Sequence, residues 1–222
     1  MWQLHLRRLA YRRRVAGTAL HSCWQAPLPS TSSDWREVSF LVVDGEMSSL
    51  DVSTGELLSV GWVVVEGGAI SLATAEHHLI RAERSVGQSA AIHHLRDFDL
   101  IDAGERDQVL EQFMRVAAGK VLVFHNAALD MAFLNKISRR YFQAPMLMPV
   151  VDTLTQEESL LRRRDQPIKP GELRLQACRE RYNLPHFHGH NALLDALATA
   201  ELLIAMASNR AAGKRLQLNQ LL

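Results

Sequence analysis

Short runs of apolar, largely β-branched residues set the strongest limit on how this chain folds. Runs at 39–43, 58–65 and 121–124 are typical of buried β-strands, and a shorter one at 150–151 suits the end of a strand. Residues 77–81 are expected to pair beside the 58–65 strand after a turn. The chain up to residue 81 therefore predicts strands joined in hairpins.

Helical patterns alternate with the later strands. Apolar residues recur at helical spacing over 104–118, and a second helix is predicted over 128–142. Two further helices are expected near 171–182 and 191–208. Strands that come first in hairpins and then alternate with helices imply an α/β fold, in which helices flank a mixed sheet.

Charge divides the chain into a basic beginning and a slightly acidic body. Residues 1–36 hold six arginines against the single acid Asp34. We therefore predict a basic arm and linker over 1–36. A domain over 37–210 and a tail over 211–222 are expected to follow. The arm is compatible with an organellar presequence or with contact to nucleic acid or a partner, but a solvated, poorly ordered arm is favoured, as is a frayed tail. The acidic body argues against tight binding of duplex DNA.

Two further features exclude whole classes of protein. No apolar run approaches the roughly 18–20 residues of a membrane-spanning helix, so no membrane partner is predicted. Cys23 and Cys178 are the two cysteines, too few for a disulfide framework or a four-thiolate zinc site. Both observations fit a cytoplasmic protein.

The first chemical signal follows a predicted strand. Asp44 and Glu46 come directly after the apolar run, and residues two apart in an extended chain point to the same side. Their like charges repel unless a cation lies between them. A divalent metal site is one interpretation, and an ordinary turn after a strand is the other.

Two more acids stand near the starts of predicted helices. Asp130 lies in a first turn, where the helix dipole also favours an acid. Asp195 lies in a largely apolar helix, where a carboxylate is expensive to bury without a partner. Five residues correspond to about 500° of helix, so His190 cannot share a face with Asp195 and belongs to the loop before it.

Together these residues resemble the DEDDh family of 3′–5′ exonucleases over roughly 40–206. The three family motifs occur in order. The first, Asp-x-Glu at a strand end, is matched by Asp44 and Glu46. The second, His-Asn-x-x-x-Asp, is matched by His125 to Asp130. The third, His followed five residues later by Asp-Ala, is matched by His190, Asp195 and Ala196. The chain looks most like the proofreading epsilon subunit of bacterial DNA polymerase III, since residues 88–95 resemble a stretch there with an Ile/Val-His pair.

This resemblance implies an RNase H-like fold, a mixed five-stranded sheet flanked by α-helices, and metal-dependent removal of nucleotides from a 3′ end. Two divalent cations, Mg²⁺ or Mn²⁺, would be held by the four acids, which are Asp44, Glu46, Asp130 and Asp195. His190 would be the general base that takes a proton from the attacking water. The substrate-binding set would be Met47, Ser48, Leu50, Ile92, His93 and Asn126.

The resemblance also implies partners. The expected substrate is a single-stranded or frayed 3′ end of DNA, and the expected product is a nucleoside monophosphate. The resemblance is also compatible with a polymerase partner and with a homodimer. Residues 47–49 depart from the Thr-Thr-Gly usual in the family, which leaves the substrate preference open. The alternatives are RNA 3′-end trimming and a catalytically silent nucleic-acid-binding module. A zinc site at His186, His188 and His190 is a minor alternative.

Overall fold

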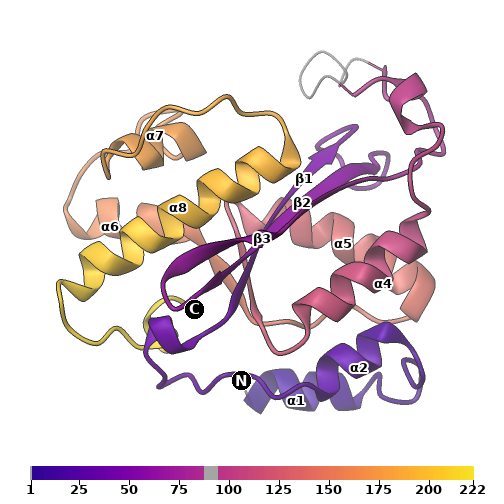
Figure 1. Ribbon diagram of the computed structural model, residues 1–222, viewed down its shortest axis with the longest axis horizontal. Helices are drawn as coiled ribbons and strands as arrows, with labels where there is room; N and C mark the ends of the chain where they lie inside the picture. The colour runs from indigo at the N-terminus through magenta and orange to yellow at the C-terminus, as the bar shows by residue number, and fades with distance from the viewer. Residues whose placement is uncertain (1, 88–94) are drawn as a thin grey trace.

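The computed structural model describes residues 2–87 and 95–222, and its centre is a five-stranded sheet. The strands are β1 (Phe40–Met47), β2 (Leu57–Glu66), β3 (Ala69–Leu79), β4 (Val121–Phe124) and β5 (Val150–Asp152). In the order β3-β2-β1-β4-β5, the first three strands are antiparallel, whereas β4 and β5 run parallel to β1 (Figure 1). The prediction of a mixed five-stranded sheet is confirmed.

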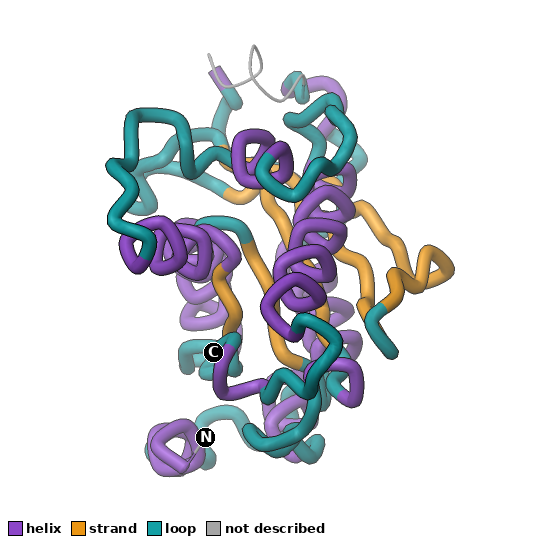
Figure 2. Tube along the Cα trace, turned by 90° about the vertical axis from the view of Figure 1, so that its left-hand side faces the viewer, coloured by secondary structure: helices purple, strands orange, loops and turns teal. Residues whose placement is uncertain are grey.

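Helices cover both faces of this sheet (Figure 1, Figure 2). One face is covered by α4 (Arg106–Ala117) and α5 (Ala127–Phe142), and the other by α8 (Ala192–Ala211), with α6 (Thr153–Arg163) and α7 (Leu175–Glu180) beside it. The remaining elements are α1 (Trp2–Leu9), α2 (Ala19–Gln25) and the short 3-10 helices η1 (Trp35–Glu37), η3 (Asp97–Leu100) and η4 (Leu218–Gln220).

Alternate residues of β1 enter two separate hydrophobic cores. Phe40 and Val42 pack in the core beneath α8, whereas Leu41 and Val43 pack in the core with α4 and α5. By the same alternation, the residues that follow Val43 also point to opposite sides. The end of β1 can therefore receive side chains from both helical layers.

The start of α8 lies against β2 because residue 61 is glycine. Gly61 pairs with Asp44 in the register of β1 and β2. A Cβ atom at Gly61 would lie 2.3 Å from the backbone nitrogen of Leu193 and 2.4 Å from the carbonyl carbon of Ala192, closer than atoms can pack. The missing side chain therefore brings the first turn of α8, which contains Asp195, close to Asp44.

The expectation of a solvated, poorly ordered arm over the first 25 residues is wrong for residues 2–25. Helices α1 and α2 fold, and Val15 and Leu20 are buried in the same core as α4 and α5. Arg8 is 5% exposed, and its guanidinium donates to the carbonyl oxygen of Leu147 at 2.9 and 3.0 Å. Clustered arginines usually remain in solvent, and the acceptor that allows this one to be buried is 139 residues away in the sequence.

The C-terminal segment also packs onto the body rather than fraying. Leu216, Leu218 and Leu221 are buried in the core beneath α8. The backbone N–H of Trp35 donates to the carbonyl of Leu216 at 2.9 Å, so the C-terminal segment is bonded to the residues that lead into β1. The two termini lie in the same half of the molecule (Figure 1).

Two helix predictions need correction. Helix α6 was not expected, and α7 occupies only part of the predicted range 171–182. The sequence signal for α6 is Asp152, whose carboxylate accepts a hydrogen bond from the backbone N–H of Leu154 at 3.0 Å. An aspartate at the N-cap position stabilises the first turn of a helix.

Helix α8 is long and apolar enough to cross a membrane by length and composition alone. This corrects the expectation that no run of that kind is present. Half of its apolar stretch is buried in the structure, where α8 packs on β1 and β2. The hydropathy of α8 thus matches its role as the helix that covers the sheet.

We expect Gly61→Ala to lower the free energy of unfolding by about 2–3 kcal/mol, because the added methyl group overlaps the α8 backbone. Denaturant unfolding followed by circular dichroism measures this change. As a control, Ala69→Val adds methyl groups at an exposed position of β3 and should change the value by less than about 0.5 kcal/mol. Equal stability of Gly61→Ala and the wild type would contradict the close packing of α8 on β2.

Candidate metal centre

Three carboxylates meet where β1 ends and α8 begins. One side-chain oxygen each from Asp44, Glu46 and Asp195 lies within 4.8 Å of the others. Asp44 and Glu46 are alternate residues of β1 and face the α8 side of the sheet, where Asp195 lies in the first helical turn. Among residues 2–87 and 95–222, this is the one group of three or more acids, histidines or cysteines with such geometry.

Asp130 approaches the same place from the opposite layer. It lies in the first turn of α5 and is 6% exposed. A Cβ atom on Gly45 would lie 3.3 Å from Oδ1 of Asp130 and 2.8 Å from Cδ1 of Leu57. The glycine between the two acids of β1 therefore leaves room for Asp130, which lies close enough to raise the pKa of Asp44 although it is outside the 4.8 Å group.

Burial and mutual repulsion make these acids hard to ionise. Burial, followed by the charges of Asp130, Asp195 and Glu46, raises the pKa of Asp44 well above its usual value. Burial and the charge of Asp195 raise the pKa of Glu46 to about 7. Burial raises the pKa of Asp130 to about 8, although backbone hydrogen bonds from Asp130 and Gly45 oppose the shift.

Asp195 differs because backbone groups partly stabilise its charge. Burial raises its pKa, while the N–H groups of His190 and Asn191 lower it by donating to Oδ2 at 2.8 and 3.1 Å. The nearby side chain of His190 also lowers the pKa of Asp195 electrostatically.

In the described ranges, no lysine or arginine forms an ion pair with any of the four acids. A cluster of partly buried carboxylates without a cation is unfavourable, and a divalent cation removes that repulsion. All the donors are hard carboxylate oxygens, the ligand type that Mg²⁺ and Mn²⁺ take. The residues therefore fit a divalent metal site.

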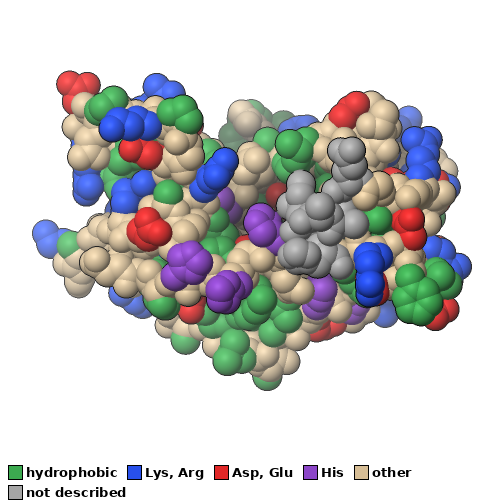
Figure 3. Space-filling view, turned by 90° about the horizontal axis from the view of Figure 1, so that it is seen from above, with side chains coloured by type: hydrophobic (Ala, Val, Ile, Leu, Met, Phe, Trp, Pro, Cys, Tyr) green, Lys and Arg blue, Asp and Glu red, His purple; other side chains and the backbone are tan. Residues whose placement is uncertain are grey.

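His190 is held at the edge of the cluster by its backbone. The residue has a φ of +71°, uncommon for a non-glycine residue, and its N–H donates to Asp195. Its imidazole is exposed. Seen from above, several histidine side chains gather on this end of the molecule (Figure 3). The ring of His190 is thus free to meet a substrate or a water molecule beside the acids.

The predicted substrate-binding residues have different surroundings. The methyl group of Met47 lies beside Gly45, at 3.2 Å from the position of its missing Cβ. The Ser48 hydroxyl accepts a hydrogen bond from the backbone N–H of Glu56 at 2.9 Å, and Leu50 is 79% exposed. Ile92 and His93 lie outside the described residues. The roles of these residues in binding stay predictions.

Asn126 is exposed and has a φ of +76°, with no side-chain capping bond to α5. The cap comes from Asp152, whose carboxylate accepts from the N–H of Asn126 at 2.9 Å and of Ala127 at 3.1 Å, as well as capping α6. Asp152 therefore orients the first turn of α5, where Asp130 lies. One carboxylate therefore caps two helices at once.

Two other histidine motifs have structural surroundings. The His125 ring hydrogen-bonds to the Thr153 hydroxyl and to the Leu173 carbonyl, both at 2.8 Å, and burial lowers its pKa. The rings of His186 and His188 stack edge to face, 5.9 Å apart. They form no metal-binding group with His190 among the described residues, which argues against the zinc alternative.

The sequence profile of a family described as Exonuclease, of the RNase T type, matches residues 41–203. Curated relatives include the PolC-type DNA polymerase III of Thermotoga maritima, 28% identical over 176 residues, and that of Staphylococcus aureus, 26% identical over 171 residues. These alignments cover 79% and 77% of this chain but 12% and 11% of the two polymerases. The chain thus spans about an eighth of the length of these relatives.

Solved structures share the fold. A zinc-bound complex of Escherichia coli exonuclease I with single-stranded DNA superposes with a TM-score of 0.67 and 14% identity, over 79% of this chain and 41% of the other. The same enzyme with a dT13 oligonucleotide has a TM-score of 0.65 and 14% identity, over 79% and 43%. At this identity the likeness establishes the architecture, and it confirms the predicted RNase H-like fold.

The metal-free protein should lose stability as the pH rises from about 4 to about 8. The folded-state pKa values of Glu46 and Asp130 are raised to about 7 and about 8, so the folded protein binds more protons than the unfolded chain in this window, and its free energy of unfolding falls with pH. At pH 8, the free energy of unfolding of Asp130→Asn should exceed that of the wild type by at least about 1 kcal/mol. The substitution removes the carboxyl group whose pKa is raised, and one pKa unit corresponds to about 1.4 kcal/mol.

Thermal unfolding of both proteins at pH 5 and pH 8, in chelator, measures this difference. Added Mg²⁺ or Mn²⁺ should stabilise the wild type at pH 8 more than Asp130→Asn. If the wild type is the more stable protein in chelator at pH 8, Asp130 is not a buried, destabilising charge.

Proposed function

Because the chain belongs to the exonuclease family, we propose that it removes nucleotides one at a time from the 3′ end of a DNA strand. Membership confirms the sequence-based expectation of a 3′–5′ exonuclease of the DEDD type. The observation that carries the proposal is the convergence of acids from β1, α5 and α8 at one point, with no basic side chain paired to them in the described residues. A divalent cation bound there would assist hydrolysis of an anionic phosphodiester by activating water and neutralising developing negative charge.

Asp44, Glu46, Asp130 and Asp195 would hold two divalent cations, Mg²⁺ or Mn²⁺. When bound, the ions would supply a more acidic water molecule and stabilise the negative charge of the leaving 3′ oxygen. The four side chains come from three elements, since β1 carries Asp44 and Glu46, α5 carries Asp130 and α8 carries Asp195. This support limits the movement of the ligands during catalysis.

His190 would act as the general base. Its exposed ring can accept a proton from the attacking water and release it to solvent, and an imidazole is suited to that exchange near neutral pH. The hydrogen bonds from the His190 and Asn191 backbone to Asp195 tie the base to a metal-ligating side chain. Base and ligand would thus move together.

The 3′-terminal nucleotide would lie against Met47, Ser48 and Leu50, with Ile92, His93 and Asn126 completing the site. Leu50 is a large apolar side chain held in solvent directly after the acidic motif, and an apolar group there can pack on a sugar or base. A strand must be single-stranded or frayed to present its last nucleotide in this way. The product would be a nucleoside monophosphate.

DNA is preferred over RNA in this proposal because the relatives described above are DNA polymerases. A polymerase partner follows from the same relatives, and a cytoplasmic location from two free, buried cysteines. The proposal includes a proofreading or repair role like that of the epsilon subunit.

Oligonucleotides with a 3′ hydroxyl should be shortened stepwise in Mg²⁺ or Mn²⁺ and left intact in chelator. Asp195→Asn should lower kcat at least about 10³-fold, because it removes a metal ligand, and His190→Ala should lower it by about 10²–10⁴-fold. Gel separation of products from single-stranded DNA, mismatched duplex DNA and RNA measures both rate and preference. The matched controls Asp102→Asn and His5→Ala change exposed residues and should behave as the wild type.

Each part of the proposal has its own contrary result. Shortening in chelator excludes the metal mechanism, and full activity of His190→Ala excludes its role as base. Degradation of RNA alone would replace the DNA substrate with RNA. Binding of oligonucleotides without any shortening would identify a silent binding module.

A further inference from the structure

The loop over 48–56 follows the acidic motif directly and is closed on itself. Ser48 and Glu56 exchange two hydrogen bonds at its base, since Ser48 N–H donates to the Glu56 carbonyl and Ser48 Oγ accepts from Glu56 N–H, both at 2.9 Å. Within the loop, the N–H of Gly55 donates to the Asp51 carbonyl at 2.7 Å. Leu50 projects from this closed loop with 79% of its surface exposed.

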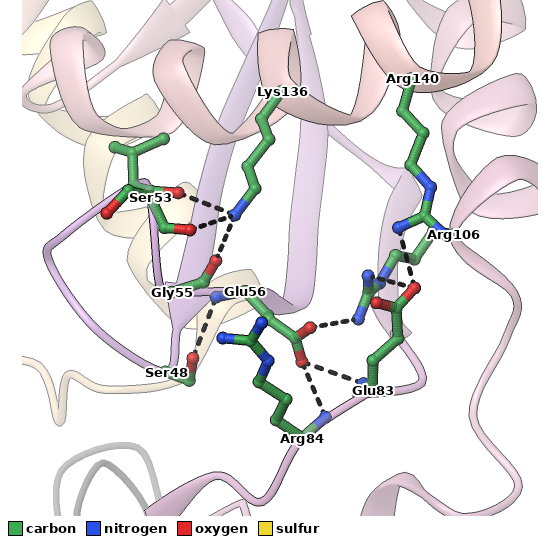
Figure 4. A network of polar contacts seen from close by, with 10 residues as sticks. Ser48, Ser53, Gly55, Glu56, Glu83, Arg84, Arg106, Lys136 and Arg140 are labelled. Carbon is green, nitrogen blue, oxygen red and sulfur yellow. Dashed lines mark hydrogen bonds and ion pairs between the residues drawn. The ribbon is translucent and has the colours of Figure 1, made fainter.

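Lys136 of α5 ties this loop to the helix that also carries Asp130. Its Nζ atom donates to the carbonyl oxygens of Val52 at 2.8 Å, Gly55 at 2.9 Å and Ser53 at 3.4 Å (Figure 4). An ammonium group has three donors, and all three are used on one loop. Lys136 forms no ion pair in the described ranges, so its side chain serves the loop backbone.

A second set of contacts fixes the base of the loop from the other side. Arg106 of α4 pairs with Glu56 and with Glu83, each at 3.0 Å, and Arg140 of α5 pairs with Glu83 at 2.9 Å. The second oxygen of Glu56 accepts from the backbone N–H groups of Glu83 and Arg84 (Figure 4). Helices α4 and α5 thereby hold the loop and the segment at 83–84 together.

We propose that Lys136 is a positioning residue that sets the affinity for the nucleic acid strand through the 48–56 loop, a role that rests on the function proposed above. A free surface loop must lose conformational freedom when a ligand orders it, and that loss weakens binding. Three bonds from Lys136 order the loop beforehand. The acids of β1 are held by the sheet, so chemistry at the metals does not depend on Lys136.

Lys136 is a cleaner probe than Arg106. The Arg106 and Glu56 side chains are 11% and 10% exposed, and removal of one leaves the other as a poorly solvated charge that weakens folding. Lys136 is exposed, so Lys136→Met keeps an apolar stem of similar length and removes the ammonium group, with its charge and its three donors. Arg139→Met is the matched control, because it removes one positive charge from an exposed position of the same helix.

Lys136→Met should raise KM for a single-stranded DNA oligomer about tenfold and leave kcat within about twofold, whereas Arg139→Met should change neither by more than about twofold. Lys136→Arg, which keeps a charged donor, should recover part of the affinity. Hydrogen exchange of the 48–56 amides in the full chain, without substrate, should become faster in Lys136→Met and remain unchanged in Arg139→Met.

Three outcomes overturn the inference: unchanged exchange of the loop amides in Lys136→Met, equal rises of KM in Lys136→Met and Arg139→Met, or a fall in kcat at constant KM. Anisotropy of a labelled dT oligomer in chelator gives the affinity without turnover. If no variant, wild type included, shortens DNA or RNA, the proposed function fails. The loop inference then stands or falls on the exchange and anisotropy results.

Discussion

Repulsion among four acids is the interaction on which this end of the molecule depends. Burial and proximity raise the pKa values of Asp44, Glu46 and Asp130, so their ionised forms are unfavourable without a cation. A fold that needed only stability would place apolar residues at these positions. The rest of the architecture keeps the carboxylates together in spite of this repulsion, which the divalent cations of the proposed function would offset.

Two glycines make the convergence sterically feasible. Gly61 lets the α8 backbone lie directly on β2, opposite Asp44, and Gly45 leaves space for Asp130 beside the end of β1. Gly61 thus allows close packing on the face covered by α8, and Gly45 does so on the face covered by α5. Asp152 adds orientation by capping α5 and α6 with one carboxylate. The positions of the acids thus follow from backbone packing around them as much as from their own contacts.

The polar network beneath the 48–56 loop extends this organisation away from the acids. Lys136 and Arg106 come from the layer that carries Asp130, and they reach a loop that continues from the strand carrying Asp44 and Glu46. A contact surface for a strand would therefore be built on β1 and α5, two of the three elements that carry the four proposed metal ligands. That shared support fixes the position of the contact surface relative to the acids.

The sequence by itself determined the sheet, most of its helices and the identity of the acids. The strand at 121–124 and the helix beginning near 128 follow from local periodicity and composition, which need no knowledge of distant residues. Only the tertiary structure decided that the N-terminal arginines belong to the body, because Arg8 is buried through a carbonyl acceptor 139 residues away. It also decided how closely the four acids approach and why Gly45 and Gly61 matter, since a close contact between layers depends on atoms that are remote in the chain.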